Sequence, residues 1–401
     1  MQLKQIEQAA NRLNGIIHET ATHYSKTFSD ISGAELYLKC ENLQKTGSFK
    51  VRGACNKIAR LAEAGSLPPL IASSAGNHAQ GVAYAATAAG AKAAIVMPRS
   101  ASIAKVSATE GYGAEVILHG SCYDEAYERA VHLQQERNAV FVHPFNDEDV
   151  IAGQGTISLE ILKALPTVNA VLIPAGGGGL LAGMAACIKQ INPGIRVIGV
   201  QAQQADAIVQ SFRAGKRVTT PTSATIADGI AVKSPGELGV SIINRFVDEM
   251  VTVSDDEIAE AILLLLERAK MVVEPAGAVT LAAALNRKTE LAGKRVVCVL
   301  SGGNIDVGFI HRVVEKGLIT RGRQIKFQTV MGDVPGNLQR FSAIVAECGG
   351  NIIMVQYDRL NAYLQLGEAI LHVACEVSSR EHGLLLLKQL EENGYRVKPE
   401  F

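Results

Sequence analysis

A lysine at the start of an expected helix is the first candidate for chemistry in this sequence. Thr46, Gly47 and Ser48 predict a helix start with Ser48 as its cap, and apolar residues follow at helical spacing at positions 51, 54, 58 and 61. Lys50 therefore falls in the first turn, where the helix dipole disfavours an ammonium. Such a lysine has a lowered pKa and can form a Schiff base with an aldehyde. The alternative is an ordinary solvated surface lysine.

Four consecutive glycines form the second candidate site. In "AVLIPAGGGGLLAG" an apolar strand runs into Gly176–Gly179 and then into a helix. The backbone N–H groups of such a loop, with a helix start behind them, can hold a phosphate. It is not a Walker loop, because no Gly-Lys-Ser/Thr follows. A glycine-rich turn with only a packing role is the alternative.

The same glycines also fit a dinucleotide fingerprint. Gly177, Gly179 and Ala182 satisfy G-x-G-x-x-A, but such a site needs an acidic residue at the end of the next strand, and that strand ends in Gln201. A nicotinamide-dependent dehydrogenase is therefore the weaker alternative. A phosphate loop combined with a Schiff-base lysine favours pyridoxal 5'-phosphate as the cofactor.

Parallel sheets are the elements that would position these residues. From about residue 34 to 310, short Val- and Ile-rich runs alternate with helical segments, which predicts an α/β fold with open parallel sheets covered on both faces. Ligands bind such sheets at the C-terminal ends of the strands. Three Gly- or Ser-rich loops lie at such ends: Ser73–His78, Gly176–Gly179 and Ser301–Gly303.

Composition limits the classes of function. The chain has 401 residues, which suggests two or three domains, and its 39 basic and 39 acidic residues give no net charge. Neutrality argues against a nucleic-acid partner or an anionic membrane surface. Seven scattered cysteines without a CxxC pair argue against a zinc or redox motif and fit a reducing cytosol. We therefore expect a cytoplasmic protein that binds neither nucleic acid nor membrane.

The pattern of elements changes near residue 320. A polar stretch at 320–324 predicts a linker. The segments beyond it predict a strand at 325–331, a helix at 337–348, strands at 351–357 and 368–377, a helix at 380–393 and a strand at 395–398. This βαββαβ order is that of a ferredoxin-like domain.

Four motifs together carry a resemblance to a known family. "SFKVRGA", "SSAGNHAQG", "GGGGLLAG" and "SGGN" resemble fold-type II pyridoxal-phosphate enzymes, which are tryptophan synthase β-like, and within them the threonine ammonia-lyase (threonine dehydratase) family. The resemblance implies a catalytic domain over 1–320, built from two open parallel-sheet subdomains, with the small one at about 41–144 inserted in the large one. "GDVPGNLQRF" resembles the D-x-P-G-x-L signature of ACT regulatory domains and implies such a domain over 325–401.

The resemblance also implies roles for individual residues. Lys50 would bind the cofactor and then act as the base, with Ser73 and Ser74 beside it in the catalytic set. Phe49 would pack on the cofactor ring, Asn77 would bind the ring hydroxyl, and Ser301 would meet the ring nitrogen. The phosphate would be held by the backbone of Gly176, Gly177, Gly178, Gly179 and Leu180, and the substrate carboxylate by Ser73, Ser74, Gly76, Asn77 and His78.

Other positions carry less definite expectations. Gln154, Gly155 and Thr156 would shape the pocket, and Glu274 would either tune the cofactor or serve a helix start. In the second domain, Asp333, Gly336 and Asn337 would open a helix that takes the carboxylate of an amino-acid effector. A Pro-Gly turn in a module that only dimerises is the alternative.

The implied reaction is α,β-elimination of water from L-threonine, giving 2-oxobutanoate and ammonia, and from L-serine, giving pyruvate, under control by an amino acid. Ser301 supports elimination over transamination, because a hydroxyl can bond a neutral ring nitrogen and leaves a weaker electron sink than a carboxylate. The alternatives are a lyase for another 3-hydroxy amino acid such as hydroxyaspartate, a serine racemase, and a non-catalytic amino-acid sensor.

Two departures from related racemases narrow these alternatives. Racemases place a serine acid/base where this chain has Ala75, so we expect poor racemisation. The carboxylates that hold their divalent cation are replaced by Gln201 and Ala207, so we expect no metal. The expected partners are a small amino-acid substrate and further copies of the chain, in a homodimer or homotetramer.

Overall fold

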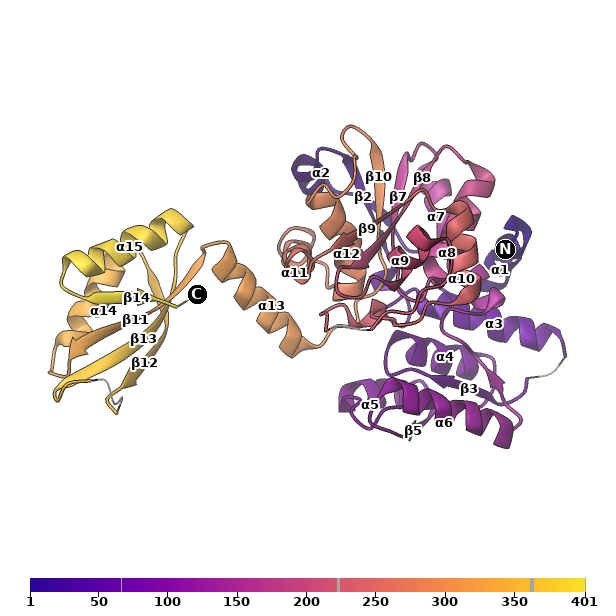
Figure 1. Ribbon diagram of the computed structural model, residues 1–401, viewed down its shortest axis with the longest axis horizontal. Helices are drawn as coiled ribbons and strands as arrows, with labels where there is room; N and C mark the ends of the chain where they lie inside the picture. The colour runs from indigo at the N-terminus through magenta and orange to yellow at the C-terminus, as the bar shows by residue number, and fades with distance from the viewer. Residues whose placement is uncertain (66, 222–223, 361–363, 401) are drawn as a thin grey trace. The chain divides into compact units, whose positions relative to one another are not determined.

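The computed structural model describes residues 1–65, 67–221, 224–360 and 364–400 (Figure 1). The chain forms two compact units, Met1–Ile305 and Asp306–Phe401. Within the described ranges, no helix combines the length and the apolar character that a membrane crossing requires.

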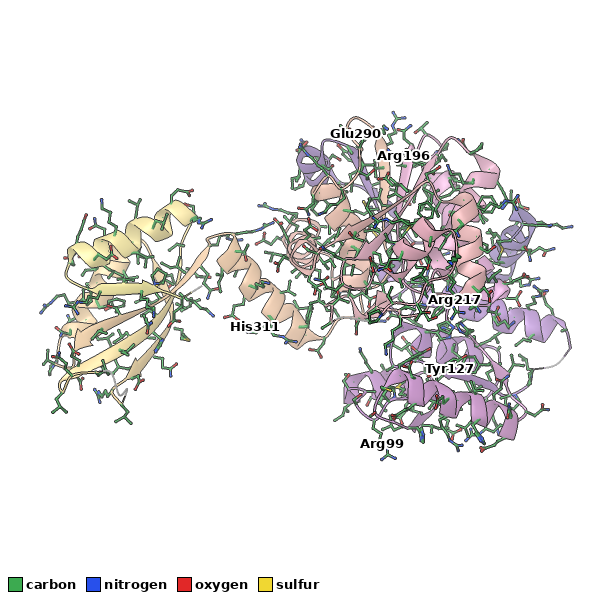
Figure 2. The ribbon with its side chains drawn as sticks, in the orientation of Figure 1. Arg99, Tyr127, Arg196, Arg217, Glu290 and His311 are labelled. Carbon is green, nitrogen blue, oxygen red and sulfur yellow. The ribbon has the colours of Figure 1, made fainter. Side chains whose placement is uncertain are left out.

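The first unit contains a six-stranded sheet. Its strand order is β1 (Thr22–Tyr24), β2 (Glu35–Cys40), β10 (Arg295–Leu300), β7 (Ala170–Pro174), β8 (Arg196–Ala202) and β9 (Glu249–Val253). The strands from β2 to β9 are parallel, and β1 is an antiparallel edge. At the start of β8, Arg196 donates to the carbonyl of Glu290 at 2.8 Å (Figure 2).

Helices cover this sheet because its central strands, β7, β8 and β10, are buried along almost their whole length. β7 is buried at every residue, as expected for a strand packed on both faces. On one face, alternate residues of β7, β8 and β10 share a core with α7 (Glu148–Ala164), α8 (Gly179–Ile191) and α10 (Glu237–Phe246). α12 (Pro275–Leu285) bonds to β10, where Thr280 donates to the Val299 carbonyl at 3.0 Å. The remaining elements of the large part are α1 (Leu3–Leu13), α2 (Lys26–Ser32), η1 (Glu41–Leu43), α9 (Ala207–Ala214), η2 (Asp228–Ile230), α11 (Asp255–Leu264) and η3 (Leu265–Ala269).

A second, smaller sheet lies within the same unit. Its four parallel strands run in the order β5 (Glu115–Leu118), β4 (Ala93–Met97), β3 (Leu70–Ser73) and β6 (Val140–Phe141), and its helices are α3 (Lys50–Glu63), α4 (Asn77–Ala88), α5 (Ile103–Gly111) and α6 (Tyr123–Glu136). Side chains alternate along β3: Leu70 and Ala72 pack with α3 and α4, and Ile71 packs with α6. The predicted α/β class with parallel sheets is confirmed.

The chain enters the small sheet once and leaves it once. It passes from β2 through η1 into α3, and it returns from β6 through residues 142–147 into α7. The small sheet is therefore an insertion between β2 and α7. Both connections lie near Lys50, because the first ends at that residue and the second places the Pro144 carbonyl 3.1 Å from its amine.

From residue 324 onward, the second unit has the predicted βαββαβ order. Its elements are β11 (Gln324–Gly332), α14 (Asn337–Glu347), β12 (Asn351–Asp358), β13 (Glu368–Glu376), α15 (Arg380–Glu392) and β14 (Arg396–Pro399), each within one residue of the prediction at either end. The antiparallel sheet has the order β12-β13-β11-β14. Its core includes Phe327, Phe341 and Leu386.

The two compact units divide one helix earlier than the sequence suggested. The predicted boundary lay at about residue 320, whereas α13 (Val307–Thr320) belongs to the second unit. An ion pair of 2.7 Å between Glu315 of α13 and Lys326 of β11 joins this helix to the sheet that follows it.

Candidate active site

A cavity of about 600 Å³ in the first unit gathers the predicted site residues. It lies where strands β3, β7 and β10 end and their loops begin, as expected for parallel sheets. The predicted residues that line it are Phe49, Lys50, Ser73, Ser74, Gly76, Asn77, His78, Gly176, Gly177, Gly178, Gly179, Leu180 and Ser301. Segments that are far apart in the chain thus meet at one cavity, while the role of each residue stays a prediction.

The helix that carries Lys50 begins differently from the prediction. Phe49 is the N-cap and Lys50 the first helical residue, so the assignment of Ser48 as the cap is wrong. Ser48 instead forms a bridge to Gly302 in the loop after β10. The Phe49 N–H donates to the Ser301 carbonyl at 3.1 Å, and this pairing ties the start of the helix to that loop.

The amine of Lys50 faces the cavity. Its Nζ donates to the Pro144 carbonyl at 3.1 Å and lies 5.3 Å from the centre of the Phe49 ring. Burial lowers the pKa of Lys50 from 10.5 to about 8, and the negative charge of Glu274 opposes part of this shift. The predicted lowering is therefore present, and its main cause is removal from water.

Glu274 belongs to a chain of polar side chains beside this amine. Asn77 donates to its Oε1 at 2.7 Å, and Asn304 donates to Asn77 Oδ1 at 2.7 Å and to the Thr46 carbonyl at 2.8 Å. Burial, followed by the charge of Asp228, raises the pKa of Glu274 to about 8. Glu274 is the N-cap of α12 by position but makes no capping bond, and it lines the cavity. Asn304 ends the "SGGN" motif, but sequence reasoning assigned it no part in the site.

The loop between β3 and α4 offers polar atoms to the cavity. Ser73 is fully buried, and among the described residues its Oγ has no hydrogen-bond partner. His78 Nε2 lies 2.7 Å from the Val142 carbonyl, which makes Nε2 the donor and leaves Nδ1 as an acceptor. Burial lowers the pKa of His78 to about 3, so the ring is neutral. Ser301 is also buried, with Oγ 3.5 Å from the Ala276 carbonyl.

The glycine loop fits a phosphate and is also required by packing. Gly178 has φ = 98° and caps α8, and no side chain of the described residues caps the first N–H groups of that helix. Those groups are the donors that an anion would use. A Cβ at Gly177 would lie 2.2 Å from the Phe145 ring, and one at Gly176 would lie 3.0 Å from Ile230 Cα. The two interpretations of the loop are therefore compatible.

Residues predicted to shape the pocket from α7 lie outside it. None of Gln154, Gly155 and Thr156 lines the cavity, so that prediction is wrong. A Cβ at Gly155 would meet the Gly183 carbonyl oxygen at 2.8 Å, because α7 and α8 pack closely there. Thr156 accepts from Arg52 at 3.2 Å. The "GQGT" segment thus serves helix packing.

A buried ionic network fixes α3 two residues beyond Lys50. The Arg52 guanidinium, fully buried, bonds to Glu41 at 2.7 and 2.8 Å and to Glu160 at 2.5 and 2.9 Å. Lys39 adds a second cation, 2.5 Å from Glu160. Two cations and two carboxylates thereby join β2, η1, α3 and α7 with no net charge.

The two positions where related racemases have metal-binding carboxylates are Gln201 and Ala207 in this chain. Gln201 Oε1 accepts from the N–H groups of Ile208 and Val209 at 3.1 Å each, so it caps α9. Ala207 is the buried first residue of that helix. Within the described part of the chain, no group of three or more His, Cys, Asp or Glu could hold a metal ion.

Two parallel sheets that meet around a lysine, a glycine loop and a serine define a class of enzyme. The family model for pyridoxal-phosphate-dependent enzymes matches residues 13–302, and the chain belongs to that family, in its fold type II. The cofactor is pyridoxal phosphate.

Particular relatives narrow this class. The chain is 48% identical over 396 residues to an L-threonine ammonia-lyase of Thermotoga maritima, covering 99% of this chain and 98% of the relative. It is 47% identical to an L-threonine ammonia-lyase of Geobacter sulfurreducens over 98% of both chains. The resemblance to the threonine ammonia-lyases is thus confirmed.

Solved structures of related enzymes share the fold of this chain. The processed form of threonine deaminase isoform 2 from Solanum lycopersicum superposes with a TM-score of 0.73 at 35% identity, over 78% of this chain and 86% of its own. A serine racemase of maize superposes with a TM-score of 0.74 at 36% identity, over 80% and 98%. The shared fold does not by itself separate deaminase from racemase.

Proposed function

We propose that this protein deaminates L-threonine to 2-oxobutanoate and ammonia, and L-serine to pyruvate and ammonia, by elimination of water. The observation that carries the proposal is a lysine amine of lowered pKa in the same cavity as a glycine loop at a helix start. The named L-threonine ammonia-lyases, similar over almost the whole chain, support threonine as the substrate.

Each group in the cavity has a part in this reaction. The cofactor would be held by the Lys50 amine, by the N–H groups of Gly176–Leu180, and by Asn77 and Ser301, and it supplies a sink for the electrons of the substrate α-carbon. The neutral Lys50 amine accepts the α-proton. The loop from Ser73 to His78 binds the substrate carboxylate through the first N–H groups of α4 and through Ser73 Oγ at the end of β3, which has no protein partner among the described residues.

Neutral groups around Lys50 support its action as a base. His78 carries no charge near neutral pH, and Glu274 is mostly protonated below pH 8. A protonated Glu274 has no negative charge to stabilise the ammonium of Lys50. The amine therefore returns to its neutral form more readily than a lysine paired with a carboxylate would.

The test is an assay of 2-oxo acids with L-threonine, L-serine and 3-hydroxyaspartate, joined to borohydride reduction and peptide mapping. We expect 2-oxobutanoate from threonine and a pyridoxyl group on Lys50. Lys50→Ala should abolish both, while Lys45→Ala, five residues earlier, should retain both. No 2-oxo acid from threonine or serine, with the cofactor bound, would contradict the proposed reaction.

Racemisation is the alternative that Ala75 disfavours. Ala75 lines the cavity and offers no proton donor there, whereas racemisation needs one on each face of the α-carbon. We expect D-serine to form from L-serine at no more than a few hundredths of the rate of pyruvate formation. Comparable rates, followed by chiral chromatography, would overturn this.

We further propose that the second unit is an ACT domain that binds an amino-acid effector. Gly336, with φ = 91°, caps α14 without a side-chain bond, which leaves N–H donors for a carboxylate. Asp333 accepts from Tyr357 at 3.0 Å and from Arg359 at 3.1 Å, and Asn337 donates to the Gly332 carbonyl at 2.8 Å. Those bonds would shape the turn around the ligand.

Activity titrated with branched-chain amino acids tests the effector. We expect the full chain to respond to one of them, and Asp333→Ala to need a several-fold higher concentration. Glu392→Gln, a surface change on α15, is the control. An identical response in Asp333→Ala would contradict the effector site.

We also propose that copies of the chain associate as a homodimer or homotetramer. Among the described residues β12 pairs with β13 alone, and it exposes Ile353, Met354 and Val355. An exposed apolar edge strand is a site for pairing with another chain. Sedimentation velocity tests this, and a monomer at micromolar concentration would refute it.

A further inference from the structure

The segment that returns the chain from the small sheet to the large one touches several parts of the cavity. The Val142 carbonyl accepts from His78 Nε2 at 2.7 Å, in the substrate loop. The Pro144 carbonyl accepts from Lys50 Nζ at 3.1 Å. Asp147 caps α7 through the N–H groups of Asp149 and Val150 and pairs with Lys57 of α3 at 2.8 Å. We call residues 142–147 the return segment.

Phe145 is the residue of the return segment that meets the glycine loop. The ring positions Cδ1, Cγ and Cδ2 lie 2.2, 2.3 and 2.6 Å from where a Cβ at Gly177 would be. A Cβ at Gly179 would lie 3.0 Å from Phe145 Cα, and one at Gly236 would lie 3.1 Å from Phe145 Cδ2. The ring therefore rests directly on the backbone of the loop.

The Phe145 ring is itself held by an aromatic neighbour and by the hydrogen bonds of the turn that carries it. His143 meets it edge-on, with ring centroids 4.7 Å apart and an interplanar angle of 85°. His143 Nδ1 accepts from the N–H groups of Phe145 at 3.3 Å and Asn146 at 2.9 Å, and Asn146 Oδ1 accepts from the Leu238 N–H at 3.1 Å. Burial lowers the pKa of His143 to about 4, so Nδ1 remains an acceptor at neutral pH. These bonds fix the turn that carries the Phe145 side chain.

A support of this kind matters because the loop cannot support itself. Four successive glycines have no side chains to pack and the widest choice of backbone angles. Their N–H groups bind a phosphate well only if they are already directed at it, since ordering them on binding would weaken the affinity. The residue before Phe145, Pro144, accepts a hydrogen bond from the Lys50 amine through its carbonyl. The same segment therefore contacts both the glycine loop and Lys50.

We propose that Phe145 is a positioning residue for the cofactor phosphate, whose ring holds the glycine loop in place relative to Lys50. The alternative is that the ring only fills space between the two sheets. If the ring only fills space, its removal should lower the stability of the protein and weaken the binding of compounds with and without a phosphate alike. The positioning role predicts a loss that depends on the phosphate.

The experiment compares pyridoxal phosphate with pyridoxal, which has the aldehyde but no phosphate. The purified protein is stripped of cofactor, and dissociation constants for both compounds are measured by absorbance for the wild type, Phe145→Ala and Phe145→Leu. Phe141→Ala is the matched control. Phe141 belongs to the same aromatic row, with its ring centroid 6.2 Å from that of His143, but it does not line the cavity.

For Phe145→Ala we expect the dissociation constant of pyridoxal phosphate to rise at least tenfold and that of pyridoxal to stay within twofold. Phe145→Leu keeps most of the side-chain volume, and its dissociation constant should rise three- to tenfold for pyridoxal phosphate but not for pyridoxal. This variant provides the test if Phe145→Ala does not fold. Phe141→Ala should change neither constant more than twofold. An unchanged affinity for pyridoxal phosphate, an equal loss for both compounds, or the same loss in Phe141→Ala would overturn the proposal.

Discussion

The pKa of Lys50 makes a quantitative prediction about how fast its amine reacts. A pKa of about 8 leaves roughly one amine in ten neutral at pH 7, whereas a pKa of 10.5 leaves roughly one in 3,000. Since only the neutral amine attacks an aldehyde, Lys50 should react about 300-fold faster at pH 7 than a lysine of ordinary pKa and equal access. The rate should rise about tenfold per pH unit below pH 7 and level off above about pH 8.5.

Glu274→Gln separates the causes of this pKa. The carboxylate raises the pKa of Lys50 only when it is ionised, and its own pKa of about 8 keeps it mostly neutral below that pH. Glutamine retains an oxygen to accept from Asn77. The variant should therefore react at the same rate as the wild type at pH 6.5. The pKa of Lys50 should be slightly lower in the variant, because no carboxylate forms beside it as the pH rises.

The assay is labelling of cofactor-free protein with pyridoxal, trapped by borohydride and counted on the peptide that contains Lys50. Pyridoxal has no phosphate, so ionisation of that group does not distort the profile. A rate that keeps rising through pH 10 would refute the lowered pKa. A tenfold difference between Glu274→Gln and the wild type at pH 6.5 would show instead that Glu274 is ionised there.

Three further predictions test other contacts. Arg52→Met should lower the free energy of unfolding by about 3–5 kcal/mol in urea denaturation, because Glu41 and Glu160 would lose their shared cation in a buried place; a loss under 1 kcal/mol would contradict this. Gly177→Ala should weaken binding of pyridoxal phosphate at least tenfold, since the new methyl would overlap the Phe145 ring. The free energy of unfolding of this variant should fall by about 1–3 kcal/mol. Treatment with EDTA should leave the deaminase activity unchanged, and restoration of lost activity by Mg²⁺ would reveal a metal requirement.

The second unit shows how far local pattern alone can predict structure. All six of its predicted elements agree with the structure within one residue at either end, because alternating strands and capped helices leave clear marks in the sequence. In the first unit, the strands in continuous apolar runs were named correctly. β1, β2 and β9 were missed, since "THY", "ELYLKC" and "EMVTV" are short and mix polar or charged residues with apolar ones.

The cavity shows where local pattern ends. Lys50 and the glycine loop could be predicted because each stands in a short motif with its own chemistry, whereas Ser301 was assigned from the resemblance of "SGGN" to a known family. Ser48 was misassigned as a cap because its partner, Gly302, lies far away in the chain. Phe145 stands in no motif, and the "SGGN" motif gives no sign of what Asn304 bonds to. Their contacts with Gly177 and Asn77 arise only when the two sheets pack together.

The two connections between the sheets have a mechanical consequence. Any rotation of the small sheet against the large one must turn about the places where the chain crosses between them, and those places are residues 41–49 and 142–147. Points near a pivot are displaced least, and Lys50 adjoins one crossing and is hydrogen-bonded to the other. β4 and β5 lie further from the second crossing, because β3 separates them from β6 in the sheet. The amine can thus stay still while the outer strands of the small sheet move.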